Sequence, residues 1–97
     1  MTNEEIWNIG LEERTDELSK LQSEYDRLDV ECRKVEFEMD MYARLREVNN
    51  AMLYKQKFSE KYEKCARESE KLTKQKNALE NEISVLKKEI YYINSLM

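Results

Sequence analysis

The chain has 97 residues, of which 39% are charged and 40% hydrophobic, and its formal net charge is −4. One glycine and no proline leave little turn chemistry, and the composition favours helix. Two cysteines without any histidine argue against a disulfide framework, a metal site or a catalytic centre, so we expect no cofactor and no enzyme. The mild charge gives no reason to expect binding to nucleic acid.

The charge is divided unevenly along the chain. Residues 1–48 carry 14 acidic and 7 basic side chains, whereas residues 49–97 carry 7 acidic and 10 basic ones. No stretch reaches the roughly 18 consecutive apolar residues of a membrane span, and the acidic start at residues 1–5 is unlike a signal peptide. We therefore expect an intracellular protein, cytoplasmic or cytoskeletal, with no membrane span.

The long helix is predicted to begin at Thr2. Thr2 and Glu5 have the spacing of a capping box, in which the hydroxyl and the carboxylate satisfy free backbone amides. Gly10, the only glycine, costs about 1 kcal/mol relative to alanine inside a helix.

Residues 3–42 form a first heptad register. Apolar residues recur at alternating spacings of three and four, which is typical of a coiled-coil seam, the helix face that packs against a partner helix. Arg14 is the one charged residue in this part of the seam. Its apolar members are Leu11, Leu18, Leu21, Tyr25, Leu28, Cys32, Val35, Met39 and Tyr42.

The heptad pattern is interrupted at about 43–57. Continuing the first register places Arg46 and Asn49 in the seam, while Leu45, Val48 and Met52 define a seam displaced by one residue. Such a discontinuity loosens the packing of a coiled coil. We interpret this range as a flexible joint, a binding site or a turn.

Residues 58–97 form a second register, with Lys76 as its polar member. Ile83 and Ile90 take position a, with Leu79 and Leu86 among the residues at position d, a pairing that favours two parallel strands. The pattern runs to the last residue, so we expect a fragment of a larger protein. The apolar seam members are Phe58, Tyr62, Cys65, Leu72, Leu79, Ile83, Leu86, Ile90, Ile93 and Met97.

The predicted fold is all-α, a single coiled-coil segment in which one long helix forms a two-stranded parallel coiled coil. The alternative is an antiparallel dimer, or a helical hairpin that assembles into a four-helix bundle. Pairing residues whose numbers add up to 97 sets position a against position d throughout and places Cys32 opposite Cys65. That pairing also lays the acidic half along the basic half.

Three kinds of residue are candidates for more than seam packing. We expect Cys32 and Cys65 to be small buried residues, although each faces its own copy in a parallel dimer. The polar seam residues can set register or extend their charged ends to solvent, and we favour register for Asn49 and extension to solvent for the others. Two adjacent tyrosines outside the seam are a possible partner patch. The polar seam residues are Arg14, Arg46, Asn49 and Lys76, with Asn49 the one assigned to register, and the patch is Tyr91 and Tyr92.

The predicted function is that of a structural dimerisation or scaffold segment in a cytoskeletal, spindle-pole, kinetochore or transport protein. Its partner is most simply a second copy or a related coiled-coil chain, with other proteins bound through flanking regions. The alternative is an adaptor helix that binds another protein's helix through the irregular centre and the tyrosine-bearing seam. The two differ in whether the chain associates with itself.

Overall fold

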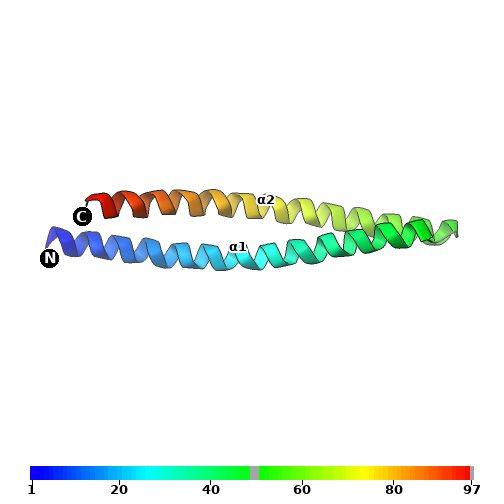
Figure 1. The fold of residues 1–97 in the computed structure, drawn as a ribbon, viewed down its shortest axis with the longest axis horizontal. Helices are drawn as coiled ribbons and strands as arrows, with labels where there is room; N and C mark the ends of the chain where they lie inside the picture. The colour runs from blue at the N-terminus through cyan, green and yellow to red at the C-terminus, as the bar shows by residue number, and fades with distance from the viewer. Residues whose placement is uncertain (49–50, 97) are drawn as a thin grey trace. The chain divides into compact units, whose positions relative to one another are not determined.

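The computed structural model describes residues 1–48 and 51–96, which form two helices (Figure 1). Helix α1 spans Asn3–Val48 and helix α2 spans Met52–Leu96. The described chain is all-helical, consistent with a helical hairpin or a coiled coil. Asn49 and Met97, two of the predicted seam residues, lie outside the described residues.

The expected single long helix is interrupted between these two helices. Ala51 belongs to neither helix, although its carbonyl accepts a 3.1 Å hydrogen bond from the Lys55 amide at the start of α2. The interruption lies in the range where the heptad phase changes. Continuing the first register beyond α1 would bring the polar Gln56 into the seam and bury little apolar surface.

The predicted capping box at the start of α1 is confirmed. The Glu5 amide donates a 3.2 Å hydrogen bond to Thr2 Oγ1, and the Thr2 amide donates a 3.3 Å bond to Glu5 Oε2. Both residues therefore satisfy backbone amides that the first helical turn leaves without partners.

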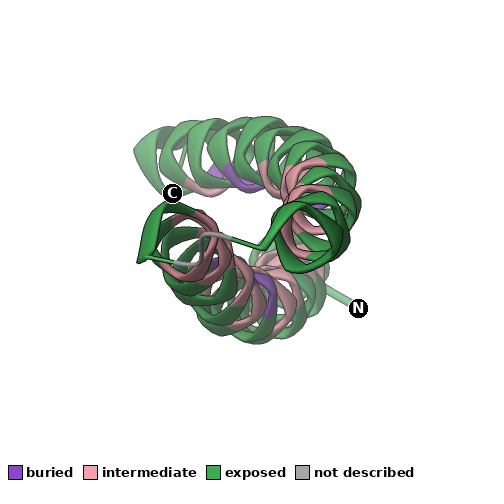
Figure 2. Cartoon of the chain, turned by 90° about the vertical axis from the view of Figure 1, so that its right-hand side faces the viewer, coloured by how far each residue is buried: buried purple, intermediate pink, exposed green. Residues whose placement is uncertain are grey.

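The chain divides into two units, each containing part of both helices. The terminal unit comprises residues 1–27 and 77–97, and the central unit comprises residues 28–76. The terminal unit buries Ile83, Leu86 and Ile93, and the central unit buries Leu28, Cys32 and Leu72. Among the described residues these buried positions are few, and most turns of both helices are exposed (Figure 2).

The contacts in the central unit join α1 and α2 in opposite sequence order. Asp29 contacts Lys76, Glu38 contacts Cys65, and the Tyr42 ring stacks on Phe58 with centroids 6.3 Å apart. Residues further along α1 therefore contact residues nearer the start of α2, which is the order of a chain that folds back on itself.

The register of these contacts differs from the predicted sum of 97. The paired numbers add up to between 100 and 108 in the central unit, and Arg14 with Glu89 gives 103 in the terminal unit. A sum near 104 is one full heptad away from 97, so position a still faces position d. The shift supplies carboxylate partners for Arg14 and Lys76, and it places Cys65 beside Glu38 instead of Cys32.

Candidate protein-interaction surface

The predicted seam is the least exposed face of both helices. All of its 18 described apolar members are buried or half-buried, and the six buried hydrophobic residues of the described chain all belong to it. Arg14, Arg46 and Lys76 are half-buried in the same face. Within each unit, therefore, the seam residues are covered by the chain itself.

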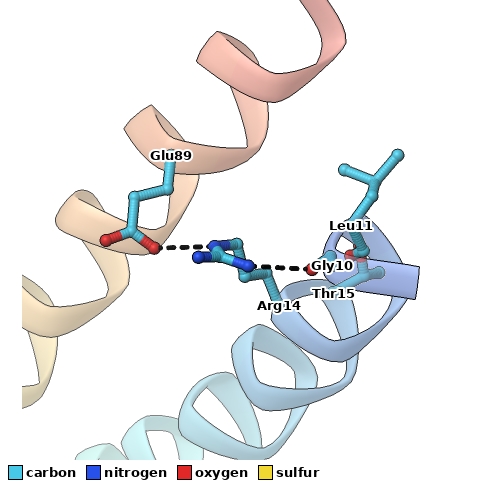
Figure 3. A network of polar contacts seen from close by, with 5 residues as sticks. All are labelled: Gly10, Leu11, Arg14, Thr15 and Glu89. Atoms are coloured by element: carbon cyan, nitrogen blue, oxygen red, sulfur yellow. Dashed lines mark hydrogen bonds and ion pairs between the residues drawn. The ribbon is translucent and has the colours of Figure 1, made fainter. Parts of the chain in front are cut away.

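Arg14 is held at two points in the terminal unit (Figure 3). Its Nε donates a 3.1 Å hydrogen bond to Glu89 Oε2 on α2, and its Nη1 donates another, also 3.1 Å, to the Gly10 carbonyl one turn earlier on α1. The guanidinium thus reaches from the seam to an acidic side chain at its edge, where the stem stays packed and the charge is partnered.

Lys76 occupies the corresponding place in the central unit. Its Nζ lies 2.7 Å from Asp29 Oδ1, and the two side chains are only 20% and 28% exposed. Arg33 approaches the other carboxylate oxygen at 2.9 Å. The hydrogen bond from Lys76, with the charges of Arg33 and Lys76 adding to it, holds the pKa of Asp29 below its usual value.

Arg46 is compensated by an aromatic ring instead of a carboxylate. Its guanidinium carbon lies 5.4 Å from the centre of the Tyr62 ring, and Lys61 Nζ lies 5.5 Å from that of Tyr42. A cation over a ring face is attracted by the ring's quadrupole. Tyr42 in the last part of α1 and Tyr62 in the first part of α2 thus partner cations within the chain.

The two cysteines differ in their surroundings. Cys32 is a buried free thiol, whereas Cys65 is half-buried and its Sγ lies 3.7 Å from Glu38 Oε2. Burial, and then the hydrogen bond to this carboxylate, raise the pKa of the Cys65 thiol. A raised pKa disfavours the reactive thiolate, which agrees with a packing role for the residue.

A second apolar surface lies on α1 away from the seam, in the central unit. Val30, Phe37 and Met41 line a shallow groove there together with Arg33, Lys34 and Glu38. Phe37 is 70% exposed, Val30 50% and Met41 38%. We call Val30, Phe37 and Met41 the α1 stripe. The prediction missed it, although the spacings of seven and four outside the seam were the signal for it.

The predicted tyrosine patch is exposed in the terminal unit. Tyr91 is 76% exposed and Tyr92 65% exposed. Val85 and Leu96 are also exposed on α2, at the same spacings of seven and four around Tyr92. The exposed rings leave room for contacts to another molecule, but no described residue of the chain stacks on them.

Comparison with protein-family models, curated proteins and solved structures gives no significant match for this chain. Among the described residues, no group of three or more acidic, cysteine or histidine side chains is placed to hold a metal ion. Neither described helix has a segment apolar enough, over the length required, to cross a membrane.

Proposed function

We propose that the chain is a structural helical hairpin that associates with a second copy, forming a scaffold segment of a larger intracellular protein. The observation that carries this proposal is the division of its apolar residues. The seam is covered within each unit, while large hydrophobic side chains such as Phe37 stay exposed elsewhere. A pair of helices has a thin core, and burying a second face against another copy stabilises it.

The charged seam residues favour the hairpin over the parallel coiled coil. A parallel in-register dimer brings Arg14, Arg46 and Lys76 against their own copies, which is repulsive in a partly desolvated seam. In the folded-back arrangement Arg14 and Lys76 contact carboxylates, and Arg46 contacts a ring. The same three residues thus oppose one topology and support the other.

A cross-linking experiment separates these topologies. In the Cys32→Ser background, Met39→Cys introduces a thiol opposite Cys65. The residue numbers 39 and 65 add up to 104, which is close to the sums found for the contacts between the two helices. Oxidation of the hairpin should give a disulfide within one chain, so the protein keeps its monomer mass on a non-reducing denaturing gel. A parallel dimer would instead give chains joined in pairs. Leu18→Cys in the same background is the matched control and should form no bond within the chain, because Leu18 belongs to the terminal unit.

Association is tested on the unmodified chain under reducing conditions. Size-exclusion chromatography with light scattering should give twice the chain mass of 11.8 kDa. A monomer mass over the whole accessible concentration range would overturn the proposal of self-association. For the cellular role, we propose a cytoskeletal, spindle-pole, kinetochore or transport assembly, which a fluorescent fusion of the chain would test by its position in dividing cells.

A second candidate function is that of an adaptor for another protein's helix. It is favoured by the large apolar side chains exposed near the interruption between the helices, namely Val48, Met52, Leu53 and Tyr54. Exposed apolar residues grouped in this way are typical of contact sites. This candidate predicts a monomer that becomes a stable heterodimer when an amphipathic partner helix is added, with Leu53→Ser weakening that complex.

A further inference from the structure

We propose that the α1 stripe is the face on which the second copy docks, stripe against stripe in antiparallel orientation. This inference rests on the proposed self-association and assigns it to named residues. Val30, Phe37 and Met41 are separated by seven and four residues, so they lie within a narrow sector of one helix face. That face points away from the seam, because none of the three belongs to it.

The exposure of the stripe is large compared with the core beside it. Among its described residues the central unit buries only Leu28, Cys32 and Leu72. Phe37 alone leaves 70% of its surface in water at the middle of the stripe. A large aromatic residue at the centre of a symmetric face contributes to the interface twice, once from each copy.

The charges that flank the stripe are complementary to the same charges on a second copy packed antiparallel. At 3.6 residues per turn, Lys34 and Glu38 lie along one edge of the stripe, and Arg33 and Asp40 lie along the other. When a second copy packs antiparallel with its two-fold axis near Phe37, the paired numbers add up to between 71 and 73. Lys34 then faces Glu38 of the second copy, Arg33 faces its Asp40, and Val30 faces its Met41.

These flanking charges can take part in such pairs without loss of a strong interaction. Arg33 contacts Asp29 with 77% of its own side chain exposed, and Arg44 contacts Asp40 with both side chains well exposed. Each pair is four residues apart on one helix, and ion pairs that involve such exposed side chains contribute little. Glu38 accepts a hydrogen bond from Cys65 through one carboxylate oxygen and has a second oxygen for a lysine. A stripe with both signs on each edge selects its own copy over a uniformly charged partner.

The test compares dimer dissociation constants of full-length variants by sedimentation equilibrium under reducing conditions. Phe37→Arg should raise the constant at least about tenfold, because the change occurs twice in the interface and buries two cations together. Its helical circular dichroism should be unchanged, since the native side chain is largely exposed. Tyr91→Arg is the matched control, an aromatic with 76% exposure outside the stripe, and should leave the constant within about twofold.

Charge exchange supplies a second variant pair. Lys34→Glu alone should weaken the dimer, because the new carboxylate faces Glu38 of the second copy. Combining it with Glu38→Lys should restore the dimer dissociation constant to near the native value. If the native chain is monomeric, both self-association and the stripe interface are wrong. If the native chain is dimeric and Phe37→Arg dimerises equally well, the stripe is wrong and the proposed function stands. Loss of dimer in Tyr91→Arg alone would move the interface to the tyrosine patch.

Discussion

Lys76 and Asp29 are 47 positions apart in sequence, yet the lysine Nζ lies 2.7 Å from a carboxylate oxygen of the aspartate. The lysine belongs to the predicted seam and the aspartate lies just beside it on the other helix. This pair joins the two ends of the central unit, where the same heptad layer also contains Leu28 and lies next to Leu72. A polar contact at this place fixes which turn of α2 lies against α1.

Asp29→Asn should lower the urea midpoint of unfolding at pH 7. The Lys76 hydrogen bond holds the folded-state pKa of Asp29 below the usual 3.8. A carboxyl with a lowered pKa stabilises the fold above its unfolded-state pKa, and the stabilisation is lost as the pH falls through the lower folded-state pKa. The difference between native and variant midpoints should therefore be constant from pH 7 to about pH 5 and shrink below about pH 4.

Glu70→Gln is the matched control for that measurement. Glu70 lies on α2 in the same central unit and contacts Lys74 four residues away, but both side chains are well exposed. Its removal should change the midpoint little at any pH. Equal effects of the two variants would contradict the role given to the contact between the helices.

Gly10→Ala should stabilise the fold by about 0.5–1 kcal/mol, because alanine loses less backbone freedom than glycine in a helix. Gly10 lies inside α1 and has no positive φ that would need glycine. A Cβ there would meet Arg14 Nη1 at 3.4 Å, an ordinary contact with the end of a flexible side chain. Urea unfolding followed by circular dichroism at a fixed protein concentration measures the gain, and a loss would show that the guanidinium cannot adjust.

Glu38→Gln should speed alkylation of Cys65 by iodoacetamide at pH 8. The carboxylate contributes to the raised pKa of this thiol, so its removal increases the thiolate fraction. Burial is the larger cause of the raised pKa, and the rate should stay below that of an unfolded chain in urea. The measurement uses the Cys32→Ser background, with Glu36→Gln as a control that removes an acidic side chain without contact to the thiol.

Helix and seam could be predicted from sequence because they depend on local spacing. The capping residues Thr2 and Glu5 act within one turn, and a three-four rhythm determines which face of a helix is apolar whatever covers it. Which turns of the two helices lie opposite each other depends instead on contacts between residues that are far apart in the sequence. A heptad pattern is unchanged by a shift of seven residues, so periodicity alone does not distinguish a sum of 97 from one near 104.

The choice of register becomes clear only when single charged residues are considered. Arg14 and Lys76 break the apolar pattern, and the sequence alone predicts that they set register or extend their charged ends to solvent, without identifying a partner for either. In the structure their partners, Glu89 and Asp29, lie at the seam edge of the opposite helix. The α1 stripe was not predicted, because its three apolar residues form a much shorter repeat than the seam of the same helix.

The core of each unit is only one side chain deep, and this affects how the molecule moves. Even the least exposed side chains, Leu28, Cys32 and Leu72, keep 4% of their surface accessible, and no described side chain is completely enclosed. Each buried residue is therefore supported by neighbours within a turn or two along the helices, as in proteins built from stacked repeats. Amide hydrogen exchange in such a molecule proceeds through local openings that spread from the helix ends, in which a few turns separate and close again while the rest stays folded.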